Sequence, residues 1–132
     1  MSQMTVALRS IPDTQAALGR AGGHTVVIDR PPGKAGGMGL GFNGGEMIAL
    51  AIGGCFCNDL RYMAETMGLR VDDIAVEVEI TLEGQPALVT AARVSARVEG
   101  DGDVAELIRR AAADSTVGNS VQRGFPVTIS QV

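Results

Sequence analysis

The chain has 132 residues, of which 45% are hydrophobic and 20% charged; this fits one globular domain over residues 1–132 and argues against disorder or a coiled coil. Its net charge of −4 and its single lysine, Lys34, exclude the clustered positive charge that nucleic-acid binding requires. No stretch approaches the ~20 apolar residues that cross a bilayer, and the N-terminus has no secretion signal, so we expect a soluble, cytoplasmic protein.

Short β-like runs and a glycine-rich stretch come first in the chain. Residues 4–8 and 24–29 are rich in Val, Thr and Ile, and turn-forming Pro, Asp and Gly separate them. They predict an antiparallel meander. Residues 31–45 hold too many glycines for a stable helix or a regular strand. We therefore predict a loop there that approaches another part of the molecule closely.

Residues 46–69 predict a long helix, because they contain no proline and many helix formers. Asn43 is the expected N-cap and Gly68 the expected stop. The first half of the segment is apolar on all sides, which is typical of a helix buried in the middle of a structure. The adjacent Gly53 and Gly54 would let another backbone pack closely against it.

A hairpin, a second helix and a last strand complete the predicted order. Residues 74–82 alternate apolar and acidic side chains and residues 87–98 repeat the pattern more loosely, so together they predict a hairpin. Residues 103–115 predict an amphipathic helix, and residues 125–132 predict a strand. This order is typical of an α+β fold with a mainly antiparallel sheet and a buried central helix.

Two cysteines, Cys55 and Cys57, fall in the helical segment. They are too few and too close together for a secreted disulfide framework, so we expect a reducing compartment. His24 is the only imidazole, so the chain cannot assemble the usual four ligands of a zinc site, and we expect no metal or other cofactor. On a helix the two thiols point about 200° apart, so a disulfide between them would require unwinding.

The charged residues one turn further on distinguish the two thiols. Cys57 is followed by Arg61 at i+4, whereas Cys55 is followed by Asp59. A neighbouring cation activates a cysteine, so from the residues alone Cys57 is the more reactive candidate. Two less specific interpretations stay open. Either cysteine can be an inert core residue, and Asp59 and Arg61 can belong to ion pairs at the surface or at an interface.

The block from Asp29 to Leu60 resembles the segment of the OsmC and organic hydroperoxide resistance family in which a glycine-rich loop leads past an acidic residue into a central helix that carries a cysteine. The hairpin, the second helix ending near ADSTVGNSV and the strand FPVTISQV follow in the family's order. The resemblance covers nearly the whole chain from about Thr5. It implies an OsmC-like fold and a homodimer in which two intertwined subunits enclose paired sites.

The resemblance also implies roles for single residues. In catalytic members the helix cysteine attacks a peroxide, and a second cysteine near the end of the next helix resolves the sulfenic acid as a disulfide. By position Cys55 is the attacking residue, and Ser115 stands in place of the resolving cysteine. Glu46 matches the acid of the OsmC-like branch, whereas the hydroperoxide resistance branch carries its acid one residue earlier, at Gly45.

A partner arginine comes from the N-terminal strands of the family, where this chain offers Arg9, Arg20 and Arg30. We therefore expect a protein of oxidative-stress defence that reduces organic hydroperoxides through Cys55, supported by Glu46 and one of these arginines. Serine cannot form a disulfide, so the expected reductant is an external small or protein thiol, in a cycle of one-cysteine type. Cys57 is a possible second redox residue.

Two alternatives of other kinds stay open, because the resolving cysteine and the acid at Gly45 are both missing. The first is a dimer without catalytic activity that holds a small hydrophobic ligand in a pocket lined by Met47, Leu50, Cys55 and the glycine-rich loop. The second is a redox sensor or structural dimer in which Cys55 is oxidised stoichiometrically or not at all. Ligand that co-purifies with a Cys55→Ser variant would favour the first.

Overall fold

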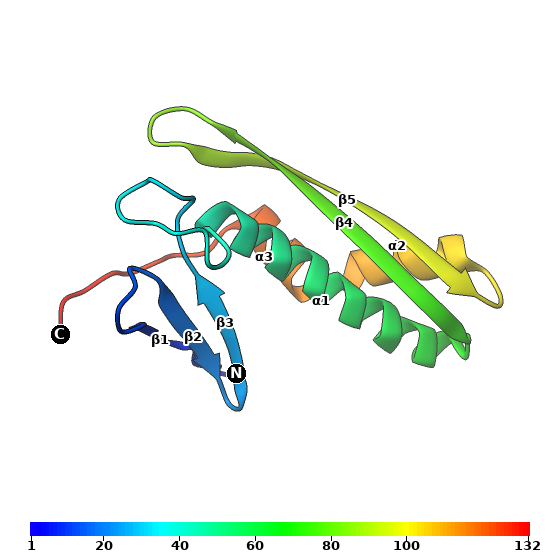
Figure 1. The fold of residues 1–132 in the computed structure, drawn as a ribbon. Coiled ribbons are helices and arrows are strands. Elements are labelled where there is room, and N and C mark those ends of the chain that lie inside the picture. The colour runs from blue at the N-terminus through cyan, green and yellow to red at the C-terminus, as the bar shows by residue number, and fades with distance from the viewer. The chain divides into compact units, whose positions relative to one another are not determined.

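The computed structural model describes residues 1–132 (Figure 1). The chain forms two compact units, Met1–Met47 and Ile48–Val132. The boundary falls within helix α1 (Gly44–Met67). The single domain expected from the sequence stays a prediction.

The first unit is built on a three-stranded antiparallel meander. Strands β1 (Ala7–Ser10), β2 (Ala17–Ala21) and β3 (His24–Ile28) pair in chain order. The sequence predicted a meander here but gave no signal for β2, whose residues ALGRA have low strand propensity. Hydrogen bonding to a neighbour on both sides holds this segment extended as the central strand.

The glycine-rich loop returns alongside β3, as its composition predicted. The Phe42 amide donates to the Val27 carbonyl and the Asp29 amide donates to the Phe42 carbonyl, both at 3.0 Å, which forms an isolated parallel bridge. A Cβ placed on Gly41 would collide with the Val27 carbonyl oxygen. Close approach of two backbones therefore requires glycine at position 41.

Helix α1 begins and ends at the predicted caps. The Glu46 amide donates to the side chain of Asn43 at 2.9 Å, and the Asn43 amide donates to the Glu46 carboxylate at 3.0 Å, forming a capping box. At the other end Gly68 has a φ of +67°, and the Leu69 amide donates back to the Ala64 carbonyl. Local sequence therefore sets both ends of the helix.

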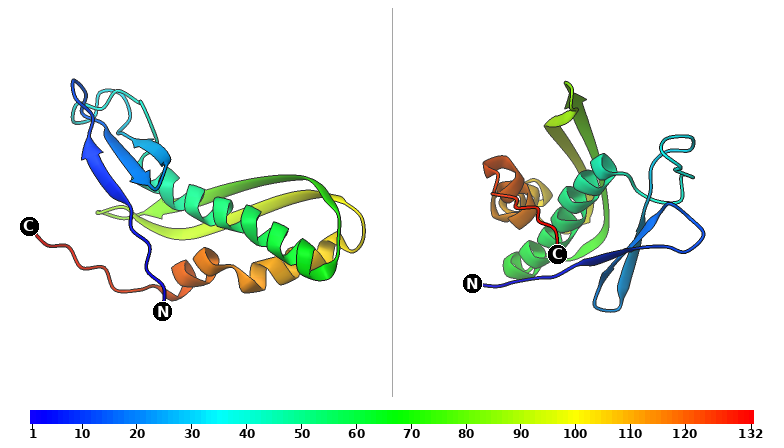
Figure 2. Two further views of the ribbon diagram at one scale, coloured as in Figure 1. Left: turned by 90° about the horizontal axis from the view of Figure 1, so that it is seen from below. Right: turned by 90° about the vertical axis from the view of Figure 1, so that its left-hand side faces the viewer.

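The second unit packs helices on one face of a long antiparallel hairpin (Figure 2). The hairpin consists of β4 (Val71–Glu83) and β5 (Leu88–Gly100), and α2 (Val104–Asp114) and α3 (Thr116–Arg123) follow it. Its buried core comes from α1 and α2 and contains Phe56, Leu60, Met63, Ala64, Leu107 and Ala111. Apolar side chains of the hairpin, such as Val76 and Val98, pack against this core.

One face of α1 is buried in this unit, while the opposite face is open. Leu50 is 45% exposed, and a side chain added at Gly54 would meet nothing within 4 Å. Burial on all sides, which the sequence predicted, is absent within the chain because the hairpin and α2 cover one side only. Gly53 makes the close approach: a Cβ there would lie 2.9 Å from Cγ2 of Val78. Neither α1 nor any other helix is long and apolar enough to cross a membrane.

The segments after the hairpin differ from the prediction in two ways. The helix predicted over 103–115 is α2; Ser115 follows it in an extended conformation (φ −61°, ψ 119°), and α3, which the sequence did not predict, begins directly after Ser115. Residues 125–132, predicted as a strand, have no regular structure, and Figure 2 shows them running away from the end of α3. A strand needs a backbone partner, and neither sheet of the chain pairs with this tail.

Candidate functional site

Cys55 lies on α1 at one border between its buried and exposed faces. Its neighbours Ile52 and Phe56 are buried, Ala51 and Gly54 are exposed, and Cys55 itself is half-buried and free of disulfides. A thiol in this position packs against the core on one side and is open on the other. The side chain is therefore not an enclosed core cysteine within this chain.

The thiol of Cys55 donates a hydrogen bond to the carboxylate of Asp59, with 3.6 Å between Sγ and Oδ2. The two residues are four apart on α1, so one helical turn places their side chains next to each other. Asp59 is half-buried and takes part in none of the ion pairs of the chain. Within the chain its carboxylate therefore serves the thiol and no cation.

Cys57 lies at the opposite border of the buried face, because two residues on a helix turn the side chain by about 200°. Arg61 donates to the Val71 carbonyl at 2.9 Å, so its guanidinium is directed to the start of β4. Cys57 has no hydrogen-bond or ion-pair partner in the chain. The structure thus pairs Cys55, and not Cys57, with a charged group.

Glu46 is not brought to Cys55 by the helix. The two residues are nine apart, which on a helix means about 13 Å along the axis and half a turn around it. The Glu46 carboxylate accepts the hydrogen bond from the Asn43 amide, so it caps α1. Gly45, the alternative position for the acid, has no side chain to contribute.

Ser115 is 5% exposed and sits where α2 ends and α3 begins. Its Oγ accepts a hydrogen bond from the Gly118 amide at 3.3 Å, which caps α3. Ser115 also lines a cavity of about 490 Å³ in the second unit. The cavity is mostly apolar, and its wall includes Ile52, Phe56, Val94, Ala96, Ile108 and Val121.

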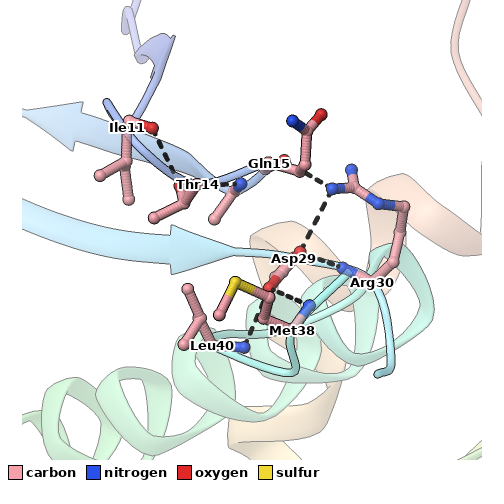
Figure 3. Close-up of polar contacts among 8 residues, drawn as sticks. Ile11, Thr14, Gln15, Asp29, Arg30, Met38 and Leu40 are labelled. Atoms are coloured by element: carbon pink, nitrogen blue, oxygen red, sulfur yellow. Dashed lines mark hydrogen bonds and ion pairs between the residues drawn. The ribbon is translucent and has the colours of Figure 1, made fainter. Parts of the chain in front are cut away.

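The candidate arginines lie in the first unit. The guanidinium of Arg30 donates to the Gln15 carbonyl and pairs with Asp29 at 3.3 Å (Figure 3). It is thus engaged with the base of the glycine-rich loop. Arg9 and Arg20 are exposed on β1 and β2 and form no ion pair.

Asp29 is a buried residue that holds the glycine-rich loop by hydrogen bonds, a role that the sequence did not predict. It is 4% exposed, and its carboxylate accepts hydrogen bonds from the amides of Met38 and Leu40 at 3.0 Å and of Arg30 at 2.8 Å (Figure 3). The bond from Leu40 is the largest cause of the lowered pKa of Asp29, burial opposes it, and the other bonds add to it. The sequence signal for this role is the position of Asp29: it is an acid directly before a glycine-rich loop, and backbone amides in a loop have no regular secondary structure to bond to.

The fold and the site define a class of protein: an α+β chain with two antiparallel sheets and a free cysteine on its long helix. Within that class, the family model described as OsmC-like protein matches residues 36–130. The chain therefore belongs to the OsmC-like protein family, as the resemblance implied.

Solved structures show the same fold. An OsmC-like protein of unknown function from Vibrio cholerae superposes with a TM-score of 0.78 at 13% identity, covering 92% of this chain and 95% of that one. Organic hydroperoxide resistance proteins give TM-scores of 0.64 for Legionella pneumophila (16% identity, 92% and 90% covered) and 0.61 for Bacillus subtilis (19% identity, 92% and 91% covered). At such identities the likeness shows the fold alone. No curated protein matches the sequence significantly.

Proposed function

We propose that this chain reduces organic hydroperoxides through Cys55, as a peroxidase of one-cysteine type in oxidative-stress defence. The observation that carries the proposal is the free, half-buried thiol at the edge of the exposed face of α1, beside a carboxylate. The family adds support, because organic hydroperoxide resistance proteins share the fold. The sulfur would attack the terminal oxygen of the hydroperoxide, giving a sulfenic acid and an alcohol.

An external thiol would complete the proposed cycle. Cys57 projects from the other side of α1, and position 115 carries an oxygen in place of sulfur, so no second thiol of the same chain is placed to resolve the sulfenic acid. A small or protein thiol would first form a mixed disulfide with Cys55, and a second thiol would release it. We place the protein in the cytoplasm, where such thiols are abundant.

The test is the mass change of the reduced protein when an alkyl hydroperoxide is added, with and without a reagent that traps sulfenic acid. We expect rapid labelling confined to Cys55 at low peroxide, loss of peroxide consumption in Cys55→Ser, and retention of it in Cys57→Ser. Labelling only at large peroxide excess would contradict the proposal and make Cys55 a packing residue.

Glu46 is part of the proposal as a supporting residue, and a substitution can separate that role from helix capping. Glutamine can keep the capping box but carries no charge. If the charge assists the reaction, Glu46→Gln slows the oxidation of Cys55 without lowering the melting temperature. If Glu46 acts only as a cap, the rate stays unchanged and only Glu46→Ala lowers stability.

We also propose that the protein is a homodimer. Leu50 on the open face of α1, Ile48 near the start of the helix, and Phe125, Val127 and Ile129 on the tail are all exposed in the single chain. Exposed apolar side chains on a helix and along an extended segment are typical of an interface between subunits. The partner would then be a second copy of this chain.

A second candidate function is the binding of a small hydrophobic molecule without turnover, which the cavity beside Ser115 favours. Its volume of about 490 Å³ lies within the range of ligand sites, and its wall is mostly apolar. It differs from the pocket expected around Met47 and Leu50, because its wall comes from α1, β5, α2 and α3. Native mass spectrometry tests it: a bound molecule that persists in Cys55→Ser would favour this function over catalysis.

A further inference from the structure

We propose that Asp59 is a catalytic residue of the Cys55 reaction, taking the thiol proton and passing it to the departing alcohol oxygen. This inference rests on the proposed function and adds a residue to it. Its basis is the hydrogen bond of 3.6 Å from the Cys55 thiol to Oδ2 of Asp59, which holds the acceptor at the reacting sulfur before any substrate arrives. Both residues stand on one continuous helix, so the spacing of their backbones is fixed.

Glu46 and Arg61, the other charged residues of α1 considered for the site, are engaged elsewhere. Glu46 caps the start of α1, and Arg61 donates to the Val71 carbonyl. No ion pair of the chain includes Asp59, so no cation competes for its carboxylate. Within the chain, Asp59 is the one acid in contact with the thiol.

The reaction balances with this single acid. The Asp59 carboxylate accepts the proton as sulfur attacks the terminal oxygen of ROOH, the S–O bond forms and the O–O bond breaks. The OH group passes to sulfur, which is oxidised to the sulfenic acid, and the leaving RO⁻ takes the proton from Asp59. The products are Cys55–SOH and ROH, and Asp59 returns to its starting state.

The choice of oxidant separates this role from a structural one. An alkoxide is a strong base and leaves far more easily when it receives a proton, whereas the carboxylate that leaves a peroxyacid needs none. We would measure single-turnover oxidation of Cys55 by tert-butyl hydroperoxide and by peracetic acid in the wild type, Asp59→Asn, Asp59→Glu and Glu65→Gln. Glu65 is the matched control, because it is an exposed acid on the same helix without a side-chain partner.

We expect Asp59→Asn to slow the reaction with tert-butyl hydroperoxide by about 10²-fold, the lower range for proton transfer by a side chain. Oxidation by peracetic acid and alkylation of Cys55 by iodoacetamide should slow much less, because there Asp59 only accepts the thiol proton and delivers none to the leaving group. Asp59→Glu should recover part of the rate, and Glu65→Gln should match the wild type.

Equal rates for Asp59→Asn and the wild type with tert-butyl hydroperoxide would overturn the role of Asp59 and leave the proposed function standing. Equal slowing with both oxidants would overturn the proposed relay, because it would show that Asp59 delivers no proton to the departing alcohol oxygen. If the wild type itself forms no sulfenic acid with either oxidant, the proposed function fails together with this inference.

Discussion

A buried carboxylate organises the glycine-rich loop. Asp29 accepts the amides of Met38 and Leu40, and each amide would otherwise lack a partner. The Met38 and Leu40 amides share Oδ2, and the Arg30 amide donates to Oδ1, so asparagine would have to direct its NH₂ group at one of these two sets of donors. We therefore expect Asp29→Asn to lose hydrogen-exchange protection either at Met38 and Leu40 together or at Arg30, while the exposed control Asp13→Asn keeps it at all three.

The same carboxylate should make the loop sensitive to acid. The pKa of Asp29 is lowered in the folded chain from its ordinary 3.8, so its contribution to stability is complete above that value and is lost as the pH falls through the lower folded pKa. Protection factors at Met38 and Leu40 should therefore fall as the pH drops below about 4. This loss should be missing from Asp29→Asn, whose side chain does not titrate; equal acid sensitivity in both proteins would contradict the assignment.

Ser115 is buried and has two capping roles: it is the C-cap of α2 and the N-cap of α3. We expect Ser115→Ala to lower the free energy of unfolding by about 1 kcal/mol, the usual cost of losing an N-cap. Chemical denaturation measures this, with the change confined to the midpoint and not the slope.

Restoring sulfur at position 115 should change the redox behaviour. We expect Ser115→Cys to form a disulfide with Cys55 under hydroperoxide, seen by mass spectrometry after proteolysis, while Ser120→Cys in α3 does not. The prediction depends on the position that the family resemblance gives to the resolving cysteine. Absence of the bond in an otherwise folded Ser115→Cys protein would show that positions 55 and 115 do not meet.

At the scale of elements, Gly53 sets how closely α1 lies on β4. A Cβ there would already lie 2.9 Å from Val78, so the branched side chain of Gly53→Val cannot be placed without movement of the helix or the strand. We expect a loss of about 1–3 kcal/mol in the free energy of unfolding, the usual cost of overpacking. The loss should shrink when Val78→Ala is added, and an unchanged loss in the double variant would contradict this contact.

The elements that local chemistry determines were predictable from the sequence. Asn43, Gly68 and the alternation along 74–82 set helix ends and a strand face through neighbours a few residues away, and the structure agrees. The strand β2 was not predictable, because pairing on both sides and not propensity makes it a strand. Helix α3 was not predicted, because most of its residues, TVGNSVQR, are poor helix formers and the Ser115 cap alone is a weak signal.

The sequence predicted which residues belong to the candidate site, but not which of their side chains contact each other. The spacing of Cys55 and Asp59 gave their proximity on a helix, but the side-chain rotamers decide whether Asp59 turns to the thiol or to a cation. Similarly, the spacing of Arg61 predicted that its guanidinium would lie beside Cys57, whereas the guanidinium donates to the Val71 carbonyl. The buried role of Asp29 depends on a loop conformation that composition does not encode.

At the scale of the whole molecule, the exposed apolar surface predicts association. Leu50 is 45% exposed and Ile129 is 92% exposed, although both are typical core residues. We expect the wild type to have the mass of a dimer in light scattering and Leu50→Glu to shift toward the monomer, because the dimer would bury the new charge. Glu99→Lys, an exposed position in β5 away from α1 and the tail, should stay dimeric. A monomeric wild type would contradict the proposed interface.

The hydroxyl at position 115 also has a kinetic meaning for the proposed cycle. A chain that cannot close an internal disulfide keeps each oxidising equivalent on one sulfur until another molecule collides with it. The steady-state fraction oxidised is then set by peroxide flux against thiol supply, and it rises as the thiol pool is depleted. When that pool runs low, Cys55 is oxidised further to the irreversible sulfinic and sulfonic acids. The fraction of protein inactivated would then grow with the excess of peroxide over thiol.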